Sequence, residues 1–185
     1  MNLVLGFIGP VFIAYMLSFT TETTMGLIMS LGATGMLVGS IAASAVKVTE
    51  GRVARIVLAA GALGAMLVLL GSSTSLIVIL AALFVGMLVV PYASAMSQSI
   101  WMSKVEPDVQ GRVFSVRSMI AQITNPVALA LVGPLVDRVF VPLMTGNSSL
   151  AGALSRITGT GAGAGYAAFF VVLGIASVVV AVGAW

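Results

Sequence analysis

The sequence has no cysteine, no histidine and few charged side chains of either sign. Only 7% of its 185 residues are charged, 8 Lys or Arg and 5 Asp or Glu, where a soluble globular domain carries about 25%. Without cysteine there is no disulfide and no thiolate metal site. Without histidine the commonest general base, proton shuttle and metal ligand is missing. These absences exclude a soluble enzyme, and we expect no catalytic residues, no cofactor and no metal.

The residues that replace the missing charge are apolar. Hydrophobic types make up 60% of the chain and the mean hydropathy is +1.20, which indicates a protein of the lipid bilayer. A membrane barrel is the competing architecture, but its strands alternate polar and apolar residues, and residues 57–70 are apolar throughout. The net charge of +3 comes from scattered cations that form no patch, so we expect no nucleic-acid partner. The sequence therefore predicts an all-α integral membrane protein.

The charge-free runs locate the spans, because a helix needs about 20 apolar residues to cross the hydrocarbon core. The longest run, residues 56–103, holds two spans separated by a hairpin at residues 71–74. An N-terminal signal peptide is the alternative for the first run, but that run has no basic start and exceeds the length of a signal core. We predict one six-helix domain over residues 1–185, with spans at approximately 2–19, 24–46, 56–71, 75–98, 113–136 and 163–184.

The basic residues predict the orientation of these spans. Six of the eight cations follow the second or the fourth span, on one side of the membrane: Lys47, Arg52, Arg55, Lys104, Arg112 and Arg117. Cytoplasmic loops carry the excess of Lys and Arg. We therefore predict a multi-pass protein of the plasma or inner membrane with both termini in the cytoplasm. The first span begins abruptly at Met1 without a flanking charge, which predicts a longer parent protein.

The spans differ in polarity. The third has no hydrogen-bonding side chain and the sixth has few, whereas the second, fourth and fifth carry several. Unpaired polar groups are costly in hydrocarbon. We therefore expect spans three and six to face lipid and spans two, four and five to face an interior, with a substrate pathway lined by Tyr92, Gln98, Gln122 and Asn125. The alternative is that these side chains bond a neighbouring helix.

Three glycines of the second span, Gly32, Gly35 and Gly39, lie on nearly one helical face. Small residues let two helix backbones approach closely, so we predict helix packing there, with a sliding surface as the alternative. No Asp, Glu, Lys or Arg falls in the middle of a predicted span. An acid that couples transport to ions would then lie on a segment outside this sequence.

Several blocks resemble a known family. They are GRVAR at residues 51–55, QGRVFSV at 110–116, Pro126, GPLVDRVF at 133–140 and the glycine-rich stretch at 159–165. In this order and spacing they resemble helices 7 to 12 of the major facilitator superfamily, in the branch of macrolide-efflux and enterobactin-exporter-like proteins. The resemblance covers essentially the whole chain. The family's N-terminal half has no counterpart here. No aspartate lies near Gly39, so the charge-relay pattern that the family has in its cytoplasmic loop between helices 8 and 9 is incomplete.

The resemblance implies one half of a twelve-helix exporter. Such a protein would move amphipathic small molecules, such as drugs, macrolides or siderophores, by alternating access and with proton coupling. Its partner would be an N-terminal six-helix half or a second copy of this chain. We interpret Arg52, Arg55, Arg112 and Arg117 as cytoplasmic latches, with positive-inside orientation as the simpler alternative. The competing function is a non-transporting membrane anchor, an assembly module or an inactive transporter fragment.

Overall fold

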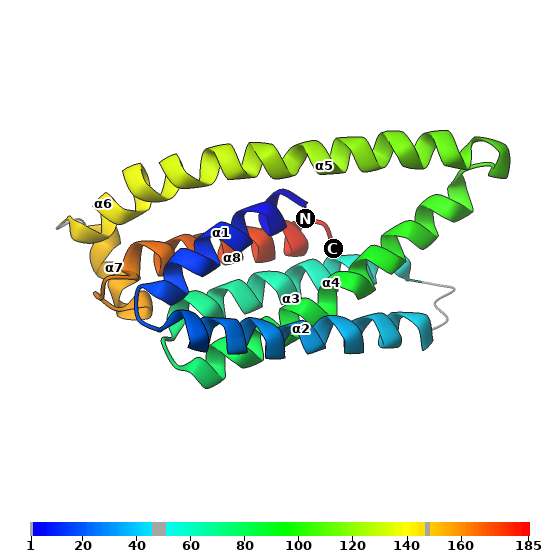
Figure 1. Ribbon diagram of the computed structural model, residues 1–185. Coiled ribbons are helices and arrows are strands. Elements are labelled where there is room, and N and C mark those ends of the chain that lie inside the picture. Colours follow the sequence, from blue (N-terminus) through cyan, green and yellow to red (C-terminus); the bar gives the residue numbers. More distant parts are fainter. Residues whose placement is uncertain (1, 46–50, 147–148) are drawn as a thin grey trace.

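The computed structural model describes residues 2–45, 51–146 and 149–185, and all their regular secondary structure is helical (Figure 1). In chain order the elements are α1 (Asn2–Leu17), α2 (Glu22–Ala45), α3 (Arg52–Ser72), α4 (Leu76–Lys104), the 3₁₀ turn η1 (Pro107–Val109), α5 (Gln110–Leu135), the π-helix η2 (Val136–Phe140), α6 (Val141–Thr145), α7 (Ser149–Thr158) and α8 (Ala164–Gly183).

Five helices are long and apolar enough to cross a membrane: α2, α3, α4, the continuous stretch Pro107–Thr145, and α8. Helix α1 is also apolar, but its 16 residues rise only about 24 Å, which is less than the roughly 30 Å of the hydrocarbon core. The prediction of an all-helical chain with several membrane-length helices is confirmed. Six spans of full length were expected, and the structure has five such helices and a shorter first one.

The helix boundaries differ most after the fifth predicted span. A loop was expected after Val136, but the helical path continues through η2 and α6 to Thr145. Pro142 has no N–H for the carbonyl of Arg138, and the turn before it widens, with the Val141 N–H donating to the Val136 carbonyl five residues back. Helix α7 then occupies ten further residues of the expected outer loop. Val46, the predicted end of the second span, and the basic residue Lys47 lie outside the described residues.

The helices pair as two related groups of three. The most extensive contacts join α3 with α8, α2 with α4, α3 with α4, and α1 with α5, and a much smaller contact joins α1 with α8. If α1 is exchanged with α4, α2 with α5 and α3 with α8, each pair in this set becomes another pair of the same set. In Figure 1 each helix also runs opposite to its counterpart, so that α1 and α4 point in opposite directions. The six long elements therefore form an inverted repeat of three helices.

The pair α3 and α8 is reciprocal down to single atoms. A β-carbon added to Gly64 would lie 2.7 Å from the carbonyl oxygen of Gly174, and one added to Gly174 would lie 2.6 Å from the carbonyl oxygen of Gly64. Each glycine also faces the backbone nitrogen of a valine four residues beyond the other glycine: Val178 at 2.9 Å and Val68 at 2.8 Å. Gly71 faces the Ala167 carbonyl oxygen of α8 in the same way, so glycine lets the two backbones approach closely over two turns of α3.

The α2–α4 pair also depends on glycine. The buried residues of α2 are Ile28 and the three glycines singled out above. A β-carbon on Gly35 or Gly39 would collide with the carbonyl oxygen of Phe84 or Leu88 of α4, and one on Gly32 would meet the side chain of Leu83. The structure therefore places these three glycines where α2 and α4 approach most closely.

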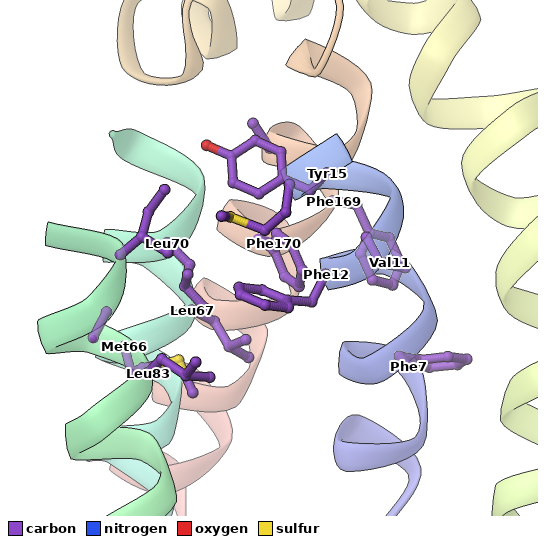
Figure 2. Packing of buried hydrophobic residues seen from close by; sticks show 14 of the residues in the cluster. Phe7, Val11, Phe12, Tyr15, Met66, Leu67, Leu70, Leu83, Phe169 and Phe170 are labelled. Carbon is purple, nitrogen blue, oxygen red and sulfur yellow. The ribbon is translucent and has the colours of Figure 1, made fainter. Parts of the chain in front are cut away.

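An aromatic cluster joins α1 to α8 (Figure 2). Phe7 packs edge-to-face on Phe169 of α8 with ring centroids 5.9 Å apart, and Tyr15 packs on Phe170 at 5.8 Å. Each such pair contributes about 0.5–1.5 kcal/mol beyond its buried area. The Tyr15 hydroxyl donates to the Ser73 carbonyl at 3.1 Å, at the link between α3 and α4. These contacts fix α1 against both groups of three helices.

Burial within this chain differs from the prediction that the apolar third and sixth spans face outward and the more polar spans face an interior. In its most apolar 18 residues α8 is 44% buried, against 22% for α2 and 17% for Pro107–Thr145. The apolar helices α3 and α8 thus bury one face against each other, and the more polar α2 and α5 are the most exposed long helices. An interior for α2 and α5 is not formed within this chain. Apolar helices pack tightly here because glycine and alanine bring their backbones together.

Gly64 and Gly61, one turn apart on α3, provide a matched test of the crossing. We expect Gly64→Ala to lower the free energy of unfolding by about 1–3 kcal/mol, because the new methyl group meets backbone atoms that cannot move aside. Gly61→Ala meets only the β-carbon of Ala181 at 3.8 Å and should be neutral or stabilising. Thermal unfolding of both variants in detergent measures the difference. Equal melting temperatures would contradict the crossing at Gly64.

Candidate functional site

One face of α5 forms an open groove. The groove has a volume of about 860 Å³ and is lined by Gly111, Phe114, Ser115, Ser118, Met119, Gln122, Ile123 and Pro126. Gln122 and Ser118 are both exposed, and the Gln122 side-chain amide donates to the Ser118 hydroxyl at 3.1 Å. This lining combines hydroxyl and amide groups with aromatic and aliphatic surface and contains no charged side chain. Such a surface suits an uncharged or weakly polar amphipathic molecule.

Asn125, three residues after Gln122, lies where α5 crosses α1. Its Oδ1 atom is 3.2 Å from the position that a β-carbon on Gly6 would occupy, and Ala128 fills the next turn of the same contact. Asn125 remains exposed although it touches α1. The two polar residues predicted for one pathway therefore divide between the groove and the edge of a helix contact.

Arg117 ties α5 to the end of α4. Its Nη1 donates to Oε1 of Gln98 at 2.7 Å and its Nη2 donates to the hydroxyl of Ser97 at 2.8 Å. The guanidinium carbon lies 5.3 Å from the ring centroid of Trp101, within cation–π range. The structure thus joins two residues that were predicted for different roles, Gln98 for the pathway and Arg117 for a latch. Sequence reasoning misses Trp101, although its spacing of three from Gln98 places both on one face of α4.

Arg52 and Arg55 bind α4 from the start of α3. The Arg55 Nη1 donates to the Tyr92 hydroxyl at 3.1 Å, and the Arg52 Nη1 approaches the Ser99 carbonyl at 3.4 Å and the Ser103 hydroxyl at 3.5 Å. Tyr92 therefore lines a groove between α3 and α4 and not the groove that contains Gln122. Of the four predicted pathway residues, Tyr92 and Gln98 are each hydrogen-bonded to an arginine of a neighbouring helix.

Arg112 has a different environment from the other three arginines. It is exposed and lines an apolar groove of about 480 Å³ at the α4–α5 end, together with Trp101, Val113, Val116, Arg117 and Ile120. Two guanidinium groups thus flank an apolar surface. Within the described part of the chain, no three His, Cys, Asp or Glu side chains are arranged to hold a metal ion.

The hydroxyl groups of α2 bond within their own helix. Ser30 donates to the Gly26 carbonyl at 2.8 Å, and Ser40 donates to the Met36 carbonyl at 2.8 Å. Their side chains are nevertheless exposed, in line with several large apolar side chains such as Leu37 and Ile41, each 68% exposed. The α2 surface away from α4 is therefore uncovered and only weakly polar.

The absence of native cysteine allows a direct test of whether the α5 groove is wet. In membrane vesicles, the thiols of Gln122→Cys and Asn125→Cys should react with a small aqueous thiol reagent, because a thiol ionises far more readily in water than in hydrocarbon. Ala128→Cys, at a fully buried position, and Val179→Cys, exposed on α8, are the controls and should not react. Equal inertness at all four positions would place the α5 groove in lipid.

The chain matches no family model, no curated protein and no solved structure. Its candidate site is therefore defined by geometry: the mixed groove on α5, the Arg117 bridge to α4, and the uncovered surface of α2.

Proposed function

We propose that this chain is one six-helix half of a secondary transporter that exports amphipathic small molecules by alternating access. The observation that carries the proposal is the exposed α5 groove around Gln122 and Ser118. A membrane-length helix that presents a polar amide and hydroxyls away from its own bundle needs water or another protein surface opposite them. A second six-helix unit facing α5 would supply that surface and enclose the groove.

The arrangement of the helices supports this proposal. Inverted repeats of three helices, nested within a six-helix half, are found in secondary transporters, where substrate binds between two halves near the middle of the membrane. Here the exchange of α1, α2 and α3 for α4, α5 and α8 preserves the helix contacts. It also pairs α2 with α5, the two long helices with the least burial. We propose that one partner unit covers both of them.

The chemistry of the groove suggests the class of substrate. The α5 groove offers one amide, two hydroxyls and an aromatic ring among aliphatic groups, and no charge. A molecule with an apolar body and a few hydrogen-bonding groups would gain from burial of its surface and would need few specific polar contacts. Protons are the coupling ion that we propose, with the acid supplied by the partner unit.

Among the four arginines, Arg112 is the one we propose as a latch to the partner. The side chains of Arg52, Arg55 and Arg117 already donate to α4. Arg112 instead stands exposed at the same end of the bundle. An exposed guanidinium suits a carboxylate of an opposing unit. We further propose that this end is cytoplasmic, in keeping with its excess of basic residues.

The proposal is tested by efflux of a fluorescent lipophilic dye from vesicles after a proton gradient is imposed. We expect little efflux from this chain alone and a clear increase when an N-terminal six-helix half is co-expressed. Gly35→Leu should abolish that increase, because the side chain would collide with the Phe84 carbonyl and displace α2. Gly26→Leu on the same helix is the matched control, since nothing lies near its β-carbon position.

The alternative outcomes separate the candidate functions. Efflux by this chain alone would mean that two copies form the transporter and that coupling needs no dedicated acid in the middle of the membrane. If no efflux occurs with this chain alone or with the co-expressed N-terminal half, although both proteins are inserted, the transporter proposal is contradicted. A membrane anchor or assembly module is then favoured.

A further inference from the structure

Helices α3, α4 and α8 carry a second feature, separate from the α5 groove. Arg55 and Tyr92, which are joined by their 3.1 Å hydrogen bond, stand at one end of a groove of about 510 Å³ between α3 and α4. The rest of this groove is apolar and is lined by Leu58, Ala59, Ala62 and Val89. A charged group therefore lies at the end of an otherwise apolar surface groove.

A second groove runs along the other side of the same ridge. Leu58 and Ala62 also line a groove of about 660 Å³ between α3 and α8. Its remaining lining is small and apolar: Val57, Gly61, Ala65, Val178, Ala181, Val182 and Trp185. The two grooves thus lie on either side of one row of α3 side chains, and Ala62 in that row is small and separates them little.

The length of the paired grooves matches one leaflet of a bilayer. Together the two grooves extend along α3 from Arg55 to Ala65, or about 15 Å, and the one that begins at Arg55 ends at Ala62, about 10 Å along the helix. Half of a hydrocarbon core of roughly 30 Å is also about 15 Å. An acyl chain whose headgroup lies at Arg55 would therefore follow a groove over about two thirds of the depth of one leaflet.

Three residues typical of the membrane interface lie at one level. The antiparallel helices α3 and α8 cross at Gly64 and Gly174. Arg55 lies nine residues before that crossing and Trp185 eleven residues after it, so their levels differ by only about 3 Å. Tyr92 is at the same level because it bonds Arg55. Tyrosine and tryptophan are enriched where hydrocarbon meets headgroups, and basic pockets between helices there bind anionic headgroups.

We propose that this face holds an anionic diacyl phospholipid, with its phosphate on Arg55 and Tyr92 and one acyl chain in each groove. Arg55 uses one N–H on the Tyr92 oxygen and keeps others for a phosphate oxygen. Because Tyr92 accepts from Arg55, its own hydroxyl proton is directed elsewhere and is available to the same phosphate. The inference rests on the proposed function only in that α3 and α8 face lipid, away from the partner unit.

Quenching of Trp185 fluorescence by brominated lipids tests the site in the reconstituted full chain. Trp101→Phe makes Trp185 the sole tryptophan. Brominated phosphatidylglycerol should bind about fivefold more tightly than brominated phosphatidylcholine, which is the preference expected for one basic residue at an anionic headgroup. Arg55→Gln should remove the preference. Ala62→Phe, whose ring would occupy part of both grooves, should reduce quenching by both lipids. Arg138→Gln, on η2, is the control and should retain the preference.

Other results would overturn the proposal. Equal quenching by the two lipids in the parent, or an unchanged preference in Arg55→Gln, would show that no headgroup is recognised at Arg55. Protection of Trp185 from both lipids would show that a second copy of the chain covers the grooves. Helical content measured by circular dichroism identifies any variant that fails to fold. The measurement involves no transport, so a failed dye efflux experiment leaves the lipid site standing and a failed quenching experiment leaves the transporter standing.

Discussion

The contact between Gly64 and Gly174 organises the rest of the molecule. Because each glycine faces the other's carbonyl oxygen, α3 and α8 cross with their backbones in contact and in opposite directions. The crossing relates the first three long helices to the last three. Helices α4 and α1 then pack on this central pair, and α2 and α5 pack outside them. Hydrophobic burial drives helix association in water but supplies little within lipid, so close backbone packing is the interaction that remains available.

This arrangement gives the two sides of the bundle different properties. On one side α3 and α8 expose aliphatic side chains and two shallow grooves that begin at Arg55 and Trp185. Elsewhere α2 and α5 expose weakly polar side chains, including the Gln122 amide. A lipid can cover the first surface at no cost in hydrogen bonds. The second surface keeps an amide with hydrogen-bonding capacity to spare, which favours water or protein opposite it and is the physical basis of the proposed transporter half.

Much of the helical architecture is predictable from the sequence, because charged residues are rare and mark the ends of apolar runs. The hairpin at residues 71–74 and the close packing face at Gly35 and Gly39 both follow from local composition. The helical path from Val136 to Thr145 does not, because Asp137 and Arg138 read as a loop although they continue a helix. Nor does pairing follow: Gln98 and Tyr92 are polar residues in a span, and nothing local indicates that each bonds an arginine 19 or 37 residues away.

The most direct test of the crossing is an engineered disulfide between α3 and α8 in this naturally cysteine-free chain. A β-carbon on Gly61 lies 3.8 Å from that of Ala181, within the range of about 3.5–4.5 Å that a disulfide spans. After oxidation in membranes, the double variant Gly61→Cys with Ala181→Cys should have no free thiols when the chain is unfolded in detergent and tagged with a maleimide, and should regain both on reduction. Gly61→Cys with Val179→Cys, whose side chain is 63% exposed, should keep both thiols. Thiols that persist in the first pair, or equal bridging in both, would contradict the account.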